Sequence, residues 1–238
     1  MNVQRLPFHV DTAGARLHGS RWAMRADQAP CVLALHGGGV STHLGAQWLT
    51  AALAAQGWPG AGFDFVGHGE TGGALEGSSL DHRIAQARAV AEALPLAAPR
   101  VLVASSMGGH IACRLIEPLR PRALVLFCPA AYESAAESQP FGPAFQRTIR
   151  ATTDFEASPA FAALARFDGR LLLVLGSEDA VIPPAVTAAY RRRARAADRA
   201  EVMVLEGAGH LLHRWLAERP EEAARVQARV LATLDGLA

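Results

Sequence analysis

The chain has 238 residues, of which 50% are hydrophobic, and its formal net charge is +1. This length and composition allow one sizeable buried core, and the near-neutral charge argues against electrostatic capture of nucleic acid or of an acidic lipid surface. All 23 basic residues are arginines, and the absence of lysine excludes Schiff-base lysines, lysine-anchored pyridoxal phosphate and P-loop nucleotide binding.

The cysteines and the hydropathy of the chain bear on its compartment. An odd number of widely spaced cysteines in apolar surroundings matches neither a disulfide framework nor a set of metal ligands, so we predict buried free thiols at Cys31, Cys113 and Cys128. Free thiols are typical of a reducing cytoplasm. No apolar run reaches the roughly 18 residues that span a bilayer, and no signal sequence is evident, so we expect a cytoplasmic protein without a membrane partner.

The first half of the chain contains strand and helix patterns in alternation. Weak alternation of apolar and polar residues over the first 30 residues predicts a hairpin at a sheet edge. The apolar run at residues 31–35 predicts a strand buried on both faces, and it ends at once in HGGG. A helix is predicted at residues 43–57, and the next strand, at residues 59–65, ends in a glycine-rich loop.

The second half continues this alternation. Apolar residues at helical spacing from Leu80 to Leu94 predict a helix that the following prolines end. A further helix is predicted directly after a strand at residues 101–105, and another closes the chain. Because such alternation requires crossover connections, we predict a single α/β domain over residues 1–238, with a mostly parallel sheet covered on both faces. The remaining strands are predicted at residues 101–105, 123–127, 171–175 and 202–205.

Two segments stand apart from this pattern. Residues 130–167 interrupt the alternation with several prolines and five phenylalanines, and we predict that they form a small lid. The arginine cluster near residue 193 is predicted to be a solvated helix face. The phenylalanines are Phe141, Phe145, Phe155, Phe161 and Phe167, and the arginines are Arg191, Arg192, Arg193 and Arg195.

Ligands of open parallel sheets bind beyond the carboxyl ends of the strands, so the residue after each strand is a candidate site residue. The strand at 101–105 is followed by Ser106, flanked by small residues in the pattern ASSMG. A serine in a sharp strand-to-helix turn exposes its hydroxyl and needs small neighbours, which favours Ser106 over Ser105 as a nucleophile. The alternative is that Ser106 only caps the N-terminus of the following helix and takes no part in catalysis.

An acid and a histidine follow two later strands. Asp179 comes after the strand at 171–175, with Glu178 as its nearest competitor and Glu133 as a more distant one. His210 lies on a glycine-bearing loop after the last strand, with His213 as the main alternative. Serine, acid and histidine therefore occur in the chain order of the α/β-hydrolase arrangement, which predicts a catalytic triad.

Five segments make the chain resemble the α/β-hydrolase superfamily nearly from end to end. The resemblance implies an eight-stranded sheet, and within the superfamily the chain is similar to the cinnamoyl/feruloyl-esterase-like and serine-aminopeptidase-like branch. The segment between FCPAA and the DFEAS stretch is shorter than in esterases with a full insertion, so their acyl pocket is not carried over. The segments are LHGGG (35–39), FDFVGHGET (63–71), ASSMGG (104–109), LGSEDAVIPP (175–184) and EGAGH (206–210).

The resemblance also implies roles for individual residues. The family pattern G-x-x-D selects Asp179 as the acid. The resemblance also implies that His36, Asp64 and His68 are structural supports of loops around the site. For the oxyanion hole we predict the backbone N–H groups of Gly38 and of Met107, which begins a helix.

These observations lead to a predicted function. We expect hydrolysis of small carboxylic esters through an acyl-enzyme, with no metal or organic cofactor. Tyr132, Phe141 and Phe145 are the candidates for binding the acyl group, and the alternative is that the phenylalanines only pack the lid onto the body. Thioesterase, aminopeptidase and carbon–carbon hydrolase activities use the same three residues, and a non-catalytic receptor is a further alternative. A homodimer is compatible with the sequence, which leaves the oligomeric state open.

Overall fold

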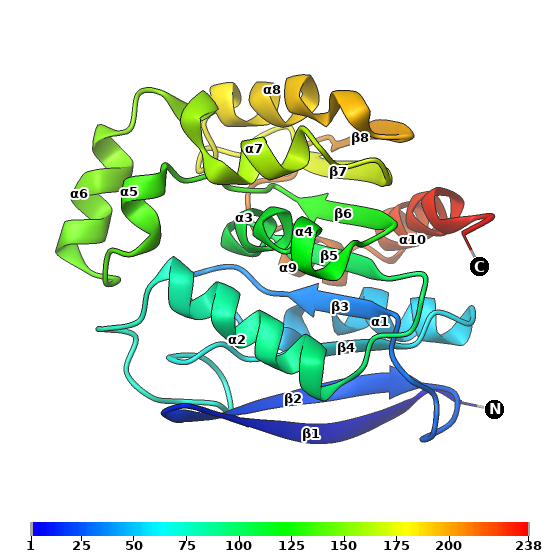
Figure 1. Ribbon diagram of the computed structural model, residues 1–238. Coiled ribbons are helices and arrows are strands. Elements are labelled where there is room, and N and C mark those ends of the chain that lie inside the picture. Colours follow the sequence, from blue (N-terminus) through cyan, green and yellow to red (C-terminus); the bar gives the residue numbers. More distant parts are fainter. Residues whose placement is uncertain (1, 238) are drawn as a thin grey trace.

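Figure 1 shows a central sheet flanked by helices. The computed structural model describes residues 2–237. Its eight strands have the order β1-β2-β4-β3-β5-β6-β7-β8, which confirms the predicted fold class. The strands are β1 (Gln4–Thr12), β2 (Ala15–Ala23), β3 (Val32–Leu35), β4 (Gly60–Phe63), β5 (Val101–Ser105), β6 (Ala123–Phe127), β7 (Arg170–Gly176) and β8 (Arg199–Leu205).

The sheet is parallel from β4 to β8, and its N-terminal edge is antiparallel. β1 pairs with β2 and β2 with β4 in antiparallel register, so the predicted hairpin lies at the sheet edge. The central strands β3 and β6 are entirely buried, as expected for strands covered on both faces. Parallel pairing brings the carboxyl ends of β3, β5, β6, β7 and β8 to one edge of the sheet.

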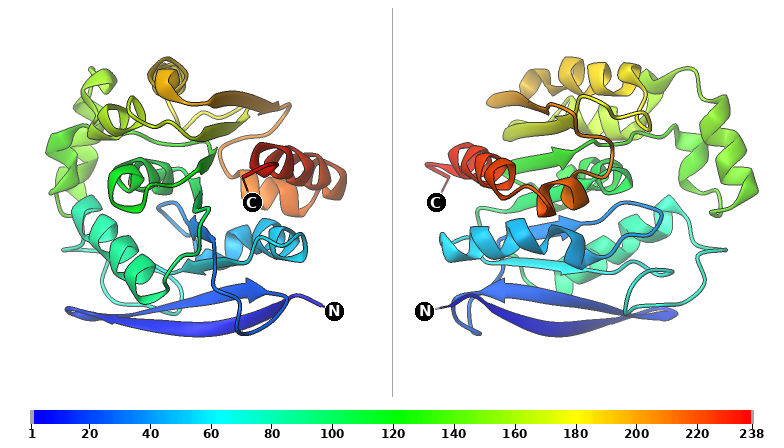
Figure 2. Two further views of the ribbon diagram at one scale, coloured as in Figure 1. Left: turned by 45° about the vertical axis from the view of Figure 1, so that its right-hand side comes forward. Right: turned by 180° about the vertical axis from the view of Figure 1, so that it is seen from behind.

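Helices cover both faces of the sheet. In Figure 2, α1, α9 and α10 lie on one face, and α2, α3 and α7 lie on the other. Ser79 caps the N-terminus of helix α2, and its Oγ accepts the backbone N–H of His82 at 3.3 Å. The helices are η1 (His43–Ala46), α1 (Gln47–Ala55), α2 (Leu80–Ala93), α3 (Met107–Arg114), α4 (Ile116–Leu119), α5 (Ser134–Glu137), α6 (Pro143–Ala151), η2 (Phe155–Ala157), α7 (Pro159–Leu164), α8 (Pro184–Arg193), η3 (Ala194–Ala196), α9 (Leu212–Ala217) and α10 (Pro220–Leu234).

The predicted lid divides into two parts. Helices α5 and α6 project beyond the carboxyl ends of the strands, at the left of Figure 1. Helix α7 belongs to the body of the protein, because it packs against α3 and α8. Its Phe161 is completely buried, with its ring 4.9 Å from that of Tyr190 in an edge-to-face contact. The projecting segment therefore ends before α7, whereas the lid is predicted to reach residue 167, and its role as a lid stays a prediction.

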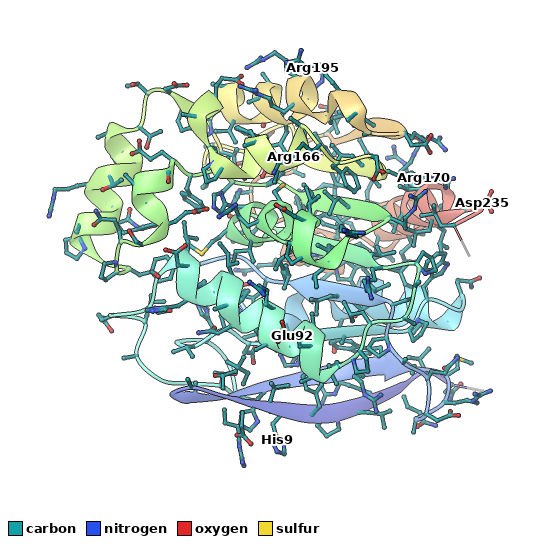
Figure 3. All side chains as sticks on the ribbon, viewed as in Figure 1. His9, Glu92, Arg166, Arg170, Arg195 and Asp235 are labelled. Carbon is teal, nitrogen blue, oxygen red and sulfur yellow. The ribbon has the colours of Figure 1, made fainter. Side chains whose placement is uncertain are left out.

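The surface and the cysteines agree with the sequence patterns. The predicted arginine face lies on α8 and η3, and Figure 3 shows Arg195 on the outer surface. Cys31, Cys113 and Cys128 are buried free thiols, as predicted. Within residues 2–237, none of the helices has the length and apolar character needed to cross a bilayer.

Candidate active site

Ser106 lies at the turn between β5 and α3. Its backbone has φ 50° and ψ −118°, a conformation that non-glycine residues rarely adopt. The backbone N–H of Ser106 donates to the carbonyl oxygen of Phe127 at 2.9 Å, which ties the turn to the end of β6. The strained turn places the Ser106 hydroxyl above the carboxyl edge of the sheet, as the small-residue pattern predicts.

The glycine after the turn allows α3 to approach the sheet closely. A Cβ atom at Gly108 would lie 2.4 Å from the carbonyl oxygen of Leu35, at the end of β3. No side chain can occupy that position without moving the backbone. Gly108 is therefore required by the packing of the serine turn against the neighbouring strand.

Ser106, Asp179 and His210 converge at this edge, although they are far apart in the chain. His210 Nε2 lies 3.0 Å from Ser106 Oγ, and His210 Nδ1 lies 3.0 Å from Asp179 Oδ2. Asp179 Oδ1 accepts the backbone N–H groups of Val181 at 2.8 Å and Ile182 at 3.1 Å, which fixes the carboxylate plane. The structure thus brings together the three residues of the predicted triad.

The charge of Asp179 determines the protonation pattern of this group. Burial raises the pKa of the Asp179 carboxyl, but hydrogen bonds from His210, Cys128 and two backbone N–H groups outweigh it and lower the pKa below its usual range. An ionised carboxylate only accepts hydrogen bonds, so it holds the proton of neutral His210 on Nδ1. Nε2 is then an acceptor that faces the Ser106 hydroxyl, as a general base must.

The competing acids lie elsewhere. Glu178 uses its backbone N–H to bond Ala208 at 2.9 Å and exposes its side chain. Glu133 precedes α5 and accepts the Thr152 hydroxyl at 3.0 Å. Among these three acids, only Asp179 is hydrogen-bonded to His210.

A second serine–histidine pair lies beside the first. Ser105 Oγ and His213 Nε2 are 2.5 Å apart, and Trp48 Nε1 donates to His213 Nδ1 at 3.1 Å. An indole nitrogen only donates, so His213 Nδ1 must accept and its proton must lie on Nε2. His213 therefore donates to Ser105 and cannot remove its proton in this tautomer.

The predicted oxyanion donors lie next to the Ser106 turn. A Cβ atom at Gly37 would be 3.2 Å from Ser106 Cβ, and one at Gly38 would be 3.0 Å from Met107 Cε. Met107 is the first residue of α3, where backbone N–H groups have no acceptor within the helix. The glycine loop after β3 thus packs against Ser106 and against the side chain of the first residue of α3.

Buried histidines and an aspartate support the surrounding loops. His36 Nε2 accepts the backbone N–H of Phe65 at 3.1 Å, and its Nδ1 bonds the carbonyl of Gly37 at 2.7 Å. Burial lowers the pKa of His36 to about 3, so the ring is neutral. Asp64 accepts the backbone N–H groups of His43 at 2.7 Å and Glu70 at 3.0 Å.

His68 is the third of the predicted loop supports. Its Nδ1 lies 3.1 Å from the carbonyl of Ser41, and its Nε2 lies 2.6 Å from Arg83 Nη2. In these contacts the three predicted supports join loop segments to one another, and none of them faces Ser106 Oγ.

The three predicted acyl-binding residues form one aromatic cluster. The rings of Tyr132 and Phe145 are 5.6 Å apart, and those of Phe141 and Phe145 are 5.0 Å apart. The backbone N–H of Tyr132 donates to Nδ1 of His110 on α3 at 3.2 Å. His110 Nε2 bonds Glu137 of α5 at 2.8 Å, so the same histidine joins the cluster and α5 to the helix that follows Ser106.

Cys128 lies beside the acid and the histidine. Potential ligand atoms of Cys128, Asp179 and His210 lie within 4.8 Å of one another, and no other such group of three occurs in the part of the chain that the structure describes. The hydrogen bonds of Asp179 and His210 already account for their orientation. We therefore assign no cofactor or metal to these residues.

Sequence reasoning missed two residues of this region. Arg83 was not singled out, although the spacing Leu80, Arg83, Ala87 places it on the apolar face of α2, where it is buried. Trp48 lies on α1 and carried no motif. The signal for Arg83 was available in the helical period, whereas the contact between Trp48 and His213 depends on the tertiary fold.

Comparisons with known proteins identify the family and the fold of the chain. A family model described as serine aminopeptidase, S33, matches residues 26–155, which is more than half of the chain. A search of the curated proteins finds no match.

Solved structures share the fold at low sequence identity. A predicted CIB-like hydrolase from Thermoplasma acidophilum is 19% identical, with a TM-score of 0.70 over 97% of this chain and 99% of that chain. The carboxylesterase CesB from Bacillus subtilis is 20% identical, with a TM-score of 0.68 over 98% and 92%. A haloalkane dehalogenase from Bradyrhizobium elkani is 18% identical, with a TM-score of 0.72 over 99% and 100%. With the family match, they lead to the conclusion that the chain belongs to the serine aminopeptidase (S33) family of α/β-hydrolase enzymes.

Proposed function

We propose that this hydrolase cleaves small carboxylic esters through an acyl-enzyme formed on Ser106. The observation that carries the proposal is the continuous hydrogen-bonded chain from Asp179 through His210 to Ser106, with both links at 3.0 Å. A serine hydroxyl becomes an effective nucleophile when a neighbouring base accepts its proton. His210 presents an unprotonated Nε2 toward that hydroxyl because Asp179 holds the proton on Nδ1.

In the first half of the reaction, Ser106 Oγ attacks the carbonyl carbon of the ester while its proton passes to His210 Nε2. The carbonyl oxygen becomes negatively charged, and the N–H groups of Gly38 and Met107 donate to it. Loss of one such donor typically costs about 2.7–4 kcal/mol of transition-state stabilisation. His210 then gives the proton to the leaving alcohol oxygen as the carbon–oxygen bond breaks, which leaves the acyl group on Ser106.

In the second half, water replaces the alcohol. His210 Nε2 accepts a proton from the attacking water, whose oxygen bonds the acyl carbon, and the proton then returns to Ser106 Oγ as the carboxylic acid leaves. Asp179 stays ionised and stabilises the imidazolium at each stage. We assign the acyl chain to the aromatic cluster of Tyr132, Phe141 and Phe145, the last of which lies on α6.

A panel of substrates tests the proposal. We expect p-nitrophenyl esters with short or medium acyl chains to be turned over faster than acyl-thioesters and aminoacyl amides, and we expect Ser106→Ala to abolish the turnover. A fluorophosphonate probe should label the wild-type protein and not the variant. Preferential cleavage of thioesters or amides would reassign the substrate class, and absence of Ser106-dependent labelling would favour a receptor.

A further inference from the structure

Arg83 is a buried cation without an anionic partner. It lies on α2, is 1% exposed, and pairs with no carboxylate within residues 2–237. Its Nε and Nη1 atoms have no hydrogen-bond partner. Its one polar contact, through Nη2, is with the neutral ring of His68 at 2.6 Å. Since a buried guanidinium without compensation is costly, a residue of this kind calls for a functional explanation.

Two aromatic rings lie against the Arg83 guanidinium, and its unmatched Nε and Nη1 donors lie on its edge. The Arg83 Cζ lies 5.1 Å from the ring centre of Phe65 and 4.7 Å from that of Phe141. Phe141 belongs to the aromatic cluster under the lid, and its backbone N–H is held by the carbonyl of Ser78 at 2.8 Å. The Ser78 hydroxyl, at the same end of α2, is also buried without a partner. An anion must therefore approach the guanidinium edge-on.

Contacts connect Arg83 to the candidate active site. His68 Nε2 accepts a hydrogen bond from Arg83, and the His68 ring lies 4.8 Å from the ring of His36. His36 bonds the carbonyl of Gly37, and Gly37 packs against Ser106. On the other side, Phe141 contacts Phe145, which contacts Tyr132. Arg83 thus lies between the loops around Ser106 and the cluster to which we assign the acyl group.

We propose that Arg83 binds a carboxylate at the far end of the acyl group, so that the substrates are half-esters of dicarboxylic acids. The inference rests on the proposed esterase function and names its substrate class. A planar carboxylate matches the edge of a guanidinium that packs against two aromatic rings, and a charge-assisted pair would satisfy the unmatched Nε and Nη1 donors. Burial lowers the pKa of Arg83 only to about 10, so the cation is present at neutral pH.

Matched substrates test this assignment through turnover. p-Nitrophenyl hydrogen glutarate and p-nitrophenyl valerate differ by a carboxylate in place of the terminal methyl group. We expect Arg83→Met to lower kcat/KM for the glutarate ester relative to the valerate ester by about 10- to 100-fold, which is the range for a hydrogen bond to a charged group. Arg83→Lys retains the charge without the planar fork, so its ratio of kcat/KM for the two esters should lie between those of the wild type and Arg83→Met. The control is Arg88→Met, on the exposed face of the same helix, which should leave the ratio unchanged.

Binding without turnover separates this inference from the proposed function. Glutarate should raise the melting temperature of the Ser106→Ala protein and should not raise that of the Ser106→Ala/Arg83→Met protein. This result would support the carboxylate site even if no ester were hydrolysed. Equal stabilisation of both proteins by glutarate would overturn the proposal. So would stabilisation by inorganic phosphate but not glutarate, or an Arg83→Met variant that slows both esters equally.

Discussion

Trp48 donates its indole N–H to Nδ1 of His213, and this contact from α1 sets the tautomer of a histidine that touches Ser105. The neighbouring histidine, His210, has the opposite tautomer, because Asp179 accepts a hydrogen bond from its Nδ1. Two adjacent serines thus each contact a histidine, but only the histidine that faces Ser106 has a free acceptor. The two serines differ because the Trp48 indole donates to Nδ1 of one histidine, whereas the Asp179 carboxylate accepts from Nδ1 of the other.

This relationship predicts opposite effects for the two serines. Ser105→Ala leaves the Nε2–H of His213 without its acceptor, so we expect the free energy of unfolding to fall by about 1–3 kcal/mol while most of the ester hydrolysis is retained. Ser106→Ala should abolish hydrolysis and fluorophosphonate labelling with little loss of stability. Urea denaturation and labelling measure the two properties separately. Labelling that persists in Ser106→Ala and disappears in Ser105→Ala would reverse the assignment.

The same histidine predicts how stability depends on pH. Burial lowers the pKa of His213 to about 4, whereas an unfolded histidine has its ordinary value of 6.5. Below pH 6.5 the unfolded chain binds a proton that the folded protein does not, so this contribution to stability is complete above pH 6.5 and is lost as the pH falls toward 4. Each such histidine contributes about 1.4 kcal/mol per pH unit in this window.

His213→Gln tests this contribution by removing the titrating group. The free energy of unfolding, measured with urea at several values between pH 4.5 and 7.5, should depend less steeply on pH in the variant than in the wild type. His36, with its pKa lowered to about 3, supplies a similar slope that both proteins retain. Equal slopes in wild type and variant would mean that the pKa of His213 is the same in the folded and the unfolded chain.

Much of the site could be predicted because it follows from strand ends. Ser106, Asp179 and His210 each follow a strand, and parallel pairing brings those ends together whatever the intervening sequence. Arg83 follows no strand. Its helical spacing indicates the buried face of α2, but an arginine in a helix normally reaches solvent, and its enclosure beside Phe65 and Phe141 depends on tertiary packing. The role of His213 was also hidden, since it depends on the position of Trp48.

The contact between the acid and histidine loops gives a third prediction, at Gly176. A Cβ atom at this position would lie 2.2 Å from the carbonyl oxygen of Ala208, in the loop that carries His210. Gly176→Ala should therefore separate Asp179 from His210. A misplacement of 1 Å in such a site can cost about 100-fold in rate, and we expect a loss of that order in kcat.

A glycine with open surroundings is the control for this variant. A Cβ atom at Gly45 would have no neighbour within 4 Å, so Gly45→Ala should retain both activity and stability. Steady-state hydrolysis and thermal unfolding of the two variants provide the comparison. If Gly176→Ala kept the wild-type kcat, the spacing of these two loops would not govern the reaction.

Asp179→Asn tests the direction of the hydrogen bonds. Asp179 Oδ1 accepts two backbone N–H groups, from Val181 and Ile182, and the amide oxygen of asparagine would take that position. The amide nitrogen would then face His210 and donate to Nδ1, which would move the imidazole proton to Nε2. His210 would donate to Ser106 instead of accepting from it, the same arrangement that Trp48 imposes on His213. By analogy with the corresponding substitution in chymotrypsin-like proteases, we expect kcat to fall by about 10⁴-fold with the fold intact.

The neighbouring acid makes this prediction specific. Glu178→Gln changes the exposed carboxylate next in the chain and should keep a rate close to that of the wild type. Because the loss in Asp179→Asn arises from a misplaced proton, neither variant should lose much thermal stability. Steady-state hydrolysis and thermal unfolding of both variants measure the two properties. A clearly lowered melting temperature in Asp179→Asn would point to disruption of the acid loop and not to the tautomer of His210.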